Sequence, residues 1–252
     1  MLTMLAIIQY NSRKLKIDLK QPNDISMPLR ASKKNVNAWY VDEPKIEPAK
    51  EDDFIISVAE GASVNFNNIS FNPHAHGTHT ETVGHITKEV HSINKNLKQF
   101  FFLAEVITVA PETFNDDRVI SKKQIQFALG NKKRDALVIR TIPNTRDKLS
   151  RQYSNTNWPY LQADAVEFLV KKGIKHLLID LPSIDKEKDG GELLGHNIFW
   201  NTKGKLRLDA TITEFIYVSN KIEDGEYFLN LQIAPFENDA TPSKPILYKT
   251  LS

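Results

Sequence analysis

The residues best suited to chemistry gather in one short stretch, residues 72–85, which holds four of the seven histidines of the chain. A buried imidazole needs partners at both ring nitrogens, so histidines seldom crowd together by accident. Glu81 follows His79 by two residues, and in an extended segment these two side chains project to the same face. Imidazole nitrogen with carboxylate oxygen is a ligand set for Zn²⁺, Mn²⁺ or Fe²⁺. The spacing therefore predicts a divalent metal site at which His79 and Glu81 converge.

An alternative interpretation is a histidine tract that scavenges metal ions without a specific function. Such tracts are polar and featureless, whereas this stretch is flanked by the apolar alternation typical of strands. Gly77 also removes a side chain in the middle of the stretch, where the backbone must bend tightly or approach a ligand closely. These features favour a specific metal or catalytic site.

The same residues resemble a known signature. The run Gly77-Thr78-His79, followed by Glu81 and His85, is similar to the pattern His-x-Gly-Thr-His-x-Asp-x-Pro-x-His of the cyclase-like metal-dependent hydrolases. That family includes bacterial kynurenine formamidases and isatin hydrolases. Glu81 stands in place of the aspartate and is one methylene longer, and Val83 stands in place of the proline.

The first histidine of the family pattern falls on Ala75, which has His74 and His76 on either side. We favour His74 as the displaced first ligand, because Pro73-His74 resembles the Pro-His pair of the family with one residue inserted. His76 is the alternative. The departures indicate a divergent branch with another substrate or metal preference.

A second block resembles the family further along the chain. Residues 176–181 are apolar and run into Asp180-Leu-Pro-Ser-Ile-Asp185, which is similar to the family's Gly-Ile-Asp-Thr-x-Ser-x-Asp. The resemblance implies that His196 binds metal and that Glu214, on a following strand, can bridge two metals. Glu214 lies inside an otherwise apolar strand, where an unpaired carboxylate is costly. A metal removes that cost, and so does a structural salt bridge.

The ligand set that the resemblance implies is His74, His79, Glu81, His196 and Glu214, which suffices for two divalent ions, zinc or manganese. His85 matches the family histidine that shuttles a proton, with service as a further ligand as the alternative. The implied reaction is hydrolysis of a C–N bond in an aryl formamide or cyclic amide by metal-activated water. Two other functions stay open: a ring-opening or ring-closing cyclase or lactonase of the same family, and a metal-free binding protein that kept the fold.

Trp39 lies in a long Pro-, Asn- and Lys-rich segment, residues 23–53, that predicts a loop. In the family an aromatic residue from this region lines the substrate pocket, which makes Trp39 the substrate-binding candidate. A packing role under the loop is the alternative.

Composition limits the remaining function classes. The chain has 252 residues and a net charge of +2 with no basic stripe, which disfavours a nucleic-acid partner. It has no cysteine, which excludes disulfides, thiolate ligands and a cysteine nucleophile. The apolar run at residues 2–8 is too short for a membrane span and lacks a basic leader. We therefore expect a single domain over residues 1–252, in a cytoplasmic protein that takes a small-molecule substrate.

Hydrophobic periodicity predicts the elements that position these residues. Helices are expected over residues 121–129, where Ser121 and Gln124 form a capping box before Gly130, and over residues 161–172. Arg140 is expected in a structural salt bridge or cap. Strands are expected at residues 4–10, 15–19, 54–58, 63–71, 100–109, 135–142, 176–181, 210–216, 227–233 and 246–250.

This pattern predicts an α/β fold with a mixed sheet, few helices and a smaller antiparallel β layer. It resembles the swivelling β/β/α-type domain of the family. The resemblance also implies a homodimer or a larger homo-oligomer.

Overall fold

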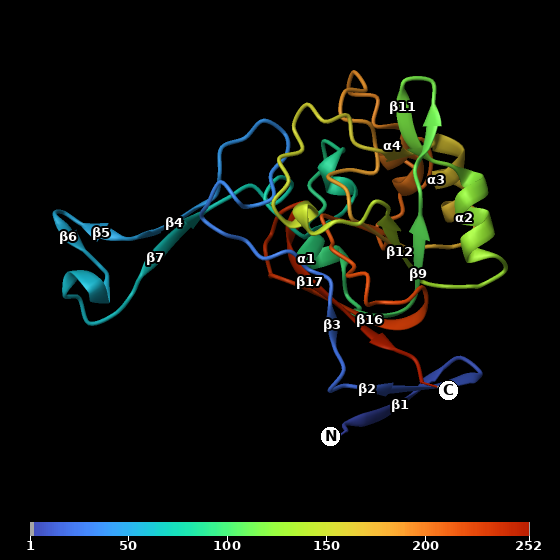
Figure 1. The fold of residues 1–252 in the computed structure, drawn as a ribbon, viewed down its shortest axis with the longest axis horizontal. Coiled ribbons are helices and arrows are strands. Elements are labelled where there is room, and N and C mark those ends of the chain that lie inside the picture. Colours follow the sequence, from blue (N-terminus) through green and yellow to red (C-terminus); the bar gives the residue numbers. More distant parts are fainter. Residues whose placement is uncertain (1–2, 252) are drawn as a thin grey trace.

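The computed structural model describes residues 3–251 and is built around a closed seven-stranded barrel (Figure 1). The strands follow one another around the barrel in the order β16, β9, β12, β14, β15, β8 and β17, and β17 pairs with β16 to close it. Their bounds are β8 His79–Glu81, β9 Phe101–Val109, β12 Ala136–Thr141, β14 His176–Ile179, β15 Thr211–Glu214, β16 Gly225–Ile233 and β17 Ala240–Lys249. Strand β3 (Asn23–Asp24) adds to the outer edge of β17.

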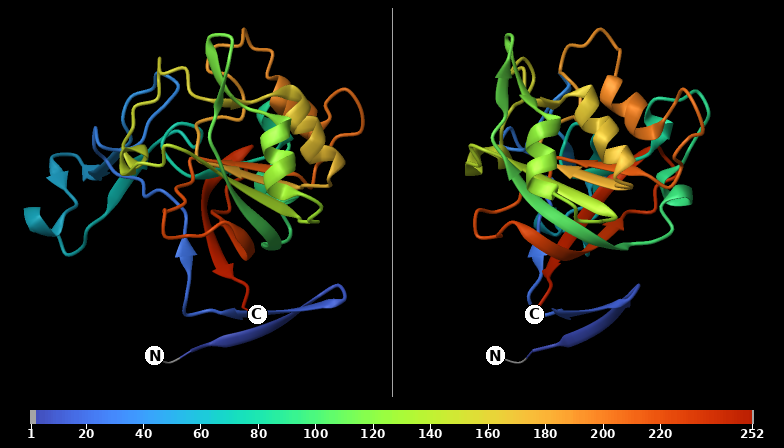
Figure 2. Two further views of the ribbon diagram at one scale, coloured as in Figure 1. Left: turned by 45° about the vertical axis from the view of Figure 1, so that its right-hand side comes forward. Right: turned by 90° about the vertical axis from the view of Figure 1, so that its right-hand side faces the viewer.

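Four of the barrel strands, β9, β12, β14 and β15, are parallel to one another, and the other pairings are antiparallel. Three helices cover the parallel side: α2 (Lys122–Leu129), α3 (Ala163–Lys171) and α4 (Leu194–Trp200), as Figure 2 shows. A short helix, α1 (Ile93–Asn96), leads into β9. The predicted α/β fold with a mixed sheet and few helices is confirmed.

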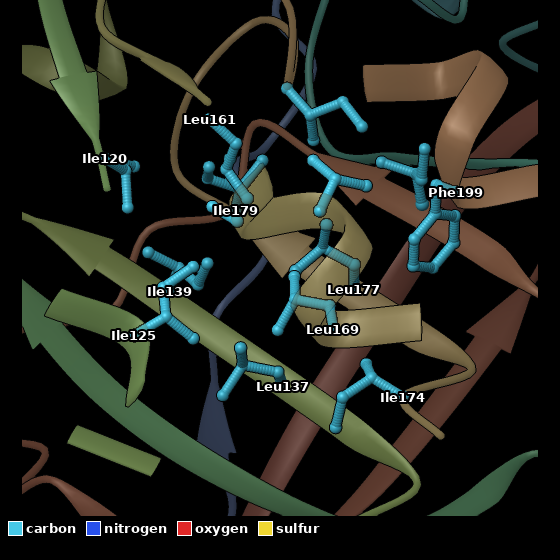
Figure 3. Packing of buried hydrophobic residues seen from close by; sticks show 14 of the residues in the cluster. Ile120, Ile125, Leu137, Ile139, Leu161, Leu169, Ile174, Leu177, Ile179 and Phe199 are labelled. Atoms are coloured by element: carbon cyan, nitrogen blue, oxygen red, sulfur yellow. The ribbon is translucent and has the colours of Figure 1, made fainter. Parts of the chain in front are cut away.

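Residues that alternate along the parallel strands build two separate cores. Leu137 and Ile139 of β12 face the helices and pack with Ile125, Leu169 and Phe199 (Figure 3). The intervening residues, such as Ala136 and Val138, face the barrel interior and pack with residues of β16 and β17. The period of two in side-chain direction explains why a strand that is buried on both faces reads as a continuous apolar run.

Local sequence signals predicted helices α2 and α3 and most strands well. Ser121 caps α2, and the side chain of Gln124 accepts a hydrogen bond from the Ser121 backbone N–H, which completes the expected capping box. Gly130 ends the helix. Arg140 pairs with Asp224 at 2.8 Å and donates to two backbone carbonyls, which confirms its expected structural role.

Four smaller β sheets lie outside the barrel within residues 3–251. Strands β1 (Leu5–Tyr10) and β2 (Arg13–Asp18) form the expected hairpin, which lies near the C-terminus (Figure 1). Strands β10 (Glu112–Phe114), β11 (Asp117–Ile120) and β13 (Tyr160–Leu161) form a three-stranded sheet beside the helices.

The expected hairpin between residues 54–58 and 63–71 is wrong. Strand β6 (Phe54–Ile55) pairs with β5 (Lys50–Glu51), and β7 (Asn67–Ser70) pairs with β4 (Lys45–Pro48). The segment expected to be a loop at residues 23–53 therefore supplies strands of its own. Local alternation marked extended backbone there, but it carried no information about which strand would become the partner.

Helix α4 was also missed, because the Gly195-His196-Asn197 sequence has weak helix propensity and no apolar period that stands out. Within residues 3–251, no helix has the length and apolar character needed to cross a bilayer.

Candidate metal centre

The barrel brings two short strands together so that their acidic and imidazole side chains share one face. Strand β8 pairs antiparallel with β15, and His79 lies opposite Glu214 while Glu81 lies opposite Ile212. Cross-strand partners and residues two apart point to the same side of a sheet. Ile212 belongs to the helix-facing core, so His79, Glu81 and Glu214 also face the helix side. The sequence prediction that His79 and Glu81 converge rested on the same period of two.

The Gly-Thr-His motif is tied to the end of β15 by the side chain of Thr78. The Thr78 hydroxyl donates to the backbone carbonyl of Phe215 and accepts a hydrogen bond from the backbone N–H of Met27 at 2.7 Å. Phe215 has a left-handed backbone, with φ of 54°, directly after Glu214. This conformation is uncommon for a bulky residue, and it ends β15 just where Glu214 enters the cluster.

Two tight turns aim the flanking histidines at Glu81. His74 lies in a turn in which its backbone N–H donates to the side chain of Asn72. His85 closes a short 3-10 turn, Val83–His85, that Thr82 caps. Gly84 packs against the His91 carbonyl so closely that a Cβ atom there would lie 2.5 Å from the oxygen. A glycine is therefore required for the turn that carries His85.

Helix α4 supplies His196, and Asp185 binds the first backbone N–H groups of this helix. The Asp185 carboxylate accepts hydrogen bonds from the backbone N–H groups of Gly195 and His196 at 2.6 and 3.1 Å. It also accepts one from His196 Nδ1 at 2.6 Å. A Cβ atom on Gly195 would lie 2.7 Å from Asp185 Oδ1, so this contact also needs a glycine.

Glu81 is the centre of the cluster and is fully buried. Its Oε2 atom lies 3.0 Å from His74 Nδ1 and 4.0 Å from His79 Nε2, and its Oε1 atom lies 3.1 Å from His196 Nε2. The other buried carboxylate, Glu214, lies 3.4 Å from His79 Nε2 and 3.9 Å from His196 Nε2. The five residues expected to bind metal thus meet in one place.

The second nitrogen of each of three imidazoles is anchored. His79 Nδ1 bonds the Gly77 carbonyl at 3.0 Å, and His196 Nδ1 bonds Asp185. His74 is anchored in the opposite sense, because its Nε2 atom bonds Asp239 Oδ2 at 2.8 Å. Such contacts fix the tautomer and leave one nitrogen of each ring aimed at the cluster, which is the arrangement found around metal-binding histidines.

Two buried atoms at the centre, His79 Nε2 and Glu81 Oε2, have no partner in hydrogen-bonding geometry, although His74 Nδ1 lies 3.0 Å from Glu81 Oε2. An unsatisfied buried polar atom costs about 1–3 kcal/mol, and a bound ligand at this place would remove that cost for both atoms. Ligand atoms of His74, His79 and Glu81 lie within 4.8 Å of one another, and so do those of Glu81, His85 and His196. Nitrogen and carboxylate oxygen suit zinc or manganese, and the residues present therefore fit a divalent metal.

The buried imidazoles and carboxylates of the cluster shift one another's pKa values. Burial opposes the charged form of His74, but the hydrogen bond with Asp239 and the nearby carboxylate of Glu81 raise its pKa to about 10. Burial likewise opposes the charged form of Glu81, yet the neighbouring imidazoles of His85, His196 and His74 hold its pKa well below the usual value. Burial and the nearby charge of Glu81 raise the pKa of Glu214. Imidazole protons thus balance the carboxylate charge, and a divalent cation could take over that balance.

Of the two candidates for the first ligand, only His74 lies in the cluster. His76 is turned away: its Nε2 atom bonds the Asp42 carbonyl at 2.8 Å, and its Nδ1 atom accepts the Asn72 backbone N–H at 2.8 Å. Both ring nitrogens of His76 are therefore occupied by backbone groups, which suits a structural role.

Trp39 lies farther from the cluster, at the end of a row of aromatic rings. Its ring packs edge-on against Trp158, with centroids 4.9 Å apart. Trp158 contacts Tyr153, which contacts Phe215, whose ring centroid lies 6.1 Å from that of His79. This packing agrees with the alternative role of Trp39 under the loop.

Sequence reasoning missed Asp239, whose Oδ2 atom bonds His74 and lies 3.5 Å from His85 Nδ1. Asp239 is 165 residues from His74, and no motif or periodicity links the two. The sequence motif also contains Asp185, but the sequence alone gave this residue no role. A search for carboxylates that could orient each histidine would have been the only available signal.

Comparisons with known proteins place the chain in a family. Residues 17–186 match the putative cyclase family. A kynurenine formamidase of Bacillus cereus is 25% identical over 229 residues, which cover 89% of this chain and 95% of the relative. A kynurenine formamidase of Bacillus cytotoxicus is 26% identical over the same shares of the two chains.

Solved structures share the fold at lower identity. An isatin hydrolase bound to the product analogue thioisatinate is 14% identical, with a TM-score of 0.64, and the match covers 92% of this chain and 93% of that one. A predicted metal-dependent hydrolase from Bacillus stearothermophilus is 18% identical with a TM-score of 0.65, over 90% and 98% of the two chains. The family match spans well over half of the sequence and includes the Gly-Thr-His motif, and this chain belongs to the putative cyclase family.

Proposed function

We propose that this protein is a metal-dependent amidohydrolase that uses water to cleave the C–N bond of an aryl formamide or a cyclic amide. The observation that carries the proposal is the pair of buried atoms without partners, His79 Nε2 and Glu81 Oε2, inside a ring of histidines whose other nitrogens are anchored. The similarity to kynurenine formamidases supports an amide substrate.

His74, His79, Glu81, His196 and Glu214 would hold one or two zinc or manganese ions. Glu81 contacts both sides of this set, because its two oxygens face different histidines: Oε2 faces His74, and Oε1 faces His196. A divalent ion held there would supply Lewis acidity and would lower the pKa of water to about 7, so that a nucleophile would be available at neutral pH.

His85 is the proposed proton carrier. Its side chain is 32% exposed, while Glu81 beside it is fully buried, so His85 lies on the open side of the cluster. Its Nε2 atom lies 3.9 Å from Glu81 Oε2, and its ring stacks on His74 with centroids 4.2 Å apart. In this position Nε2 can accept a proton from the attacking water and return it to the leaving nitrogen. Asp239, near Nδ1, orients the ring.

The role of Trp39 in substrate binding stays a prediction. Its support is indirect, since the aromatic row that begins at Trp39 ends at Phe215 beside His79.

The test begins with metal content, measured by mass spectrometry on protein purified without chelator and without a polyhistidine tag. We expect about one to two equivalents of zinc or manganese, lost in Glu81→Ala. The loaded protein is then assayed on a panel of N-formyl arylamines, including N-formylkynurenine, cyclic amides such as isatin, and aryl lactones. Hydrolysis of lactones alone would favour the lactonase alternative. Absence of metal uptake and of any hydrolysis would leave a binding protein.

A further inference from the structure

A second cavity lies at the end of the barrel opposite the candidate metal centre. It adjoins His176, the first residue of β14, and Asp135, which directly precedes β12. Strand β15 connects the two ends: it begins at Thr211, which bonds His176 Nδ1 at 2.9 Å, and it ends at Glu214 of the metal centre. The cavity volume of about 620 Å³ falls within the range of roughly 300–1,000 Å³ that is usual for small-molecule sites. This end of the barrel therefore has room for a small molecule of its own.

Aromatic rings form one wall of the cavity. The ring of Phe102 packs against that of His176, with centroids 3.8 Å apart. The neighbouring Phe101 is 55% exposed and stacks on Phe228, with centroids 5.6 Å apart. Leu97, which is buried, adds an apolar side chain. A planar ring of a ligand would gain apolar contact and aromatic packing at this wall.

Asp135 borders the cavity and keeps one carboxylate oxygen free of hydrogen bonds. Its Oδ2 atom accepts hydrogen bonds from the Tyr10 hydroxyl at 2.6 Å and from the Leu103 backbone N–H at 3.2 Å. Within residues 3–251, Oδ1 accepts none, and Asp135 forms no ion pair with a basic side chain. The other carboxylate at the cavity, Asp209, pairs with Lys175. Asp135 is therefore the acceptor that remains for a cationic group.

Lys98 and Asn96 supply donors at the same cavity. The Lys98 ammonium group donates to the Asn94 carbonyl at 3.2 Å, and it forms no ion pair with a carboxylate of the described residues. The side-chain amide of Asn96 makes no hydrogen bond within these residues, and its Nδ2 atom is buried. Rotation of this amide about its soft Cβ–Cγ torsion would turn the N–H groups into the cavity without breaking a hydrogen bond. His176 adds no charge at neutral pH, because burial lowers its pKa to about 3. Lys98 and Asn96 are thus the donors that remain for an anionic group.

We propose that this cavity binds an α-amino acid with an aromatic side chain. The ammonium group of the ligand pairs with Asp135 Oδ1, and its carboxylate accepts hydrogen bonds from Lys98 and Asn96. Its ring packs on Phe101 and Phe102. A zwitterion fits better than a singly charged ligand, because a carboxylate alone leaves Asp135 unpaired and an amine alone leaves Lys98 unpaired. None of these residues belongs to the metal centre, so binding here does not depend on the proposed activity.

Nuclear magnetic resonance titration of the isotope-labelled protein with L-phenylalanine tests both the binding and its location. We expect saturable shifts of backbone amides at residues 96–102 and 175–176, with a dissociation constant of about 1 mM or lower. Amides of residues 72–85 should not shift, because that stretch belongs to the metal centre. Absence of saturation up to the solubility limit of the amino acid, or shifts confined to residues 72–85, would overturn the proposal.

Three analogues separate the contributions of the ammonium group, the carboxylate and the ring. 3-Phenylpropanoate lacks the ammonium group, 2-phenylethylamine lacks the carboxylate, and L-alanine lacks the ring. Each should bind about 5-fold or more weakly than L-phenylalanine. An analogue that binds as tightly as L-phenylalanine would show that the missing group is not recognised, and the zwitterionic aromatic ligand would then be wrong.

Substitution Lys98→Ala removes the partner of the carboxylate. It should weaken the binding of L-phenylalanine about 5-fold and leave that of 2-phenylethylamine unchanged. Lys95→Ala is the matched control, because Lys95 is an exposed lysine of α1 that pairs with Glu237 and lies outside the cavity. Equal effects of the two substitutions on L-phenylalanine would contradict the assignment of Lys98.

Two charge changes give readouts that misfolding cannot imitate. Lys98→Glu should bind 2-phenylethylamine more tightly than the wild type does and 3-phenylpropanoate more weakly. Asp135→Asn, which keeps an acceptor for the Tyr10 hydroxyl, should bind 2-phenylethylamine more weakly and 3-phenylpropanoate at least as tightly. A gain of affinity for one analogue requires an intact cavity, whereas loss of both analogues in both variants would count against the proposal.

Discussion

Asp239 Oδ2 accepts a hydrogen bond from His74 Nε2 at 2.8 Å and so turns the Nδ1 atom of His74 toward Glu81. His79 and His196 present Nε2 instead, because their Nδ1 atoms bond Gly77 and Asp185. His74, the proposed first ligand, thus faces the cluster with Nδ1, whereas His79 and His196 face it with Nε2. The residue that makes this possible comes from the loop before the last barrel strand.

Substitution Asp239→Asn should weaken metal affinity about 10- to 100-fold, because it removes the charged acceptor that orients His74. Competition with a chromogenic chelator measures the affinity without reference to activity. Glu237→Gln is the matched control, since Glu237 lies on the same loop but pairs with Lys95 and Asn94. An affinity equal to that of the wild type in Asp239→Asn would contradict the anchoring role.

Substitution His85→Gln separates proton transfer from metal binding. If His85 carries the proton, kcat should fall about 10²- to 10⁴-fold while the bound metal equivalents stay at the wild-type value. Metal content and steady-state kinetics on the same preparation check this. Loss of one equivalent of metal would instead make His85 a ligand.

Substitution Gly195→Ala should disturb the cluster from the helix side. A Cβ atom there would lie 2.7 Å from Asp185 Oδ1, so Asp185 must withdraw from His196. We expect weaker metal binding and a lower melting temperature of the metal-free protein. Gly191→Ala is a control for loss of a glycine, because a Cβ atom there meets nothing within 4 Å. Gly191 has a positive φ of 83°, so this control carries backbone strain without a clash. Equal metal affinity in the two variants would refute the steric argument.

The buried residue His176, which is not part of the metal cluster, leads us to expect a pH dependence of stability. It is buried against Phe102, its Nδ1 atom bonds Thr211, and burial lowers its pKa to about 3. The unfolded chain, with an ordinary histidine pKa near 6.5, binds the proton first as pH falls. The contribution is therefore fully present above about pH 6.5 and is lost on acidification, at about 1.4 kcal/mol per pH unit down to about pH 3.

Urea unfolding at pH 7 and pH 5 measures this effect as a difference between proteins. The wild type should lose about 2 kcal/mol more stability than His176→Asn between these two values. Asparagine cannot titrate, and its side-chain amide can keep the hydrogen bond to Thr211. Parallel losses in the two proteins would show that His176 is not the group responsible.

The sequence alone determined the features that depend on neighbouring residues. The capping box at Ser121 and Gln124, the apolar strand at residues 136–141 and the shared face of His79 and Glu81 all follow from local geometry. Each depends on a repeat or a hydrogen bond that spans only a few residues, so the printed order of residues is enough to predict it.

The tertiary structure decided everything that depends on which distant segments meet. It separated His74 from His76, paired β7 with β4, and brought Asp239 to His74 across 165 residues. Closure of the barrel brings these segments together, because the register of β8 with β15 and β17 fixes which side chains of the three strands are neighbours. Burial of apolar surface drives that closure, and it is a property of the whole chain that no local spacing encodes.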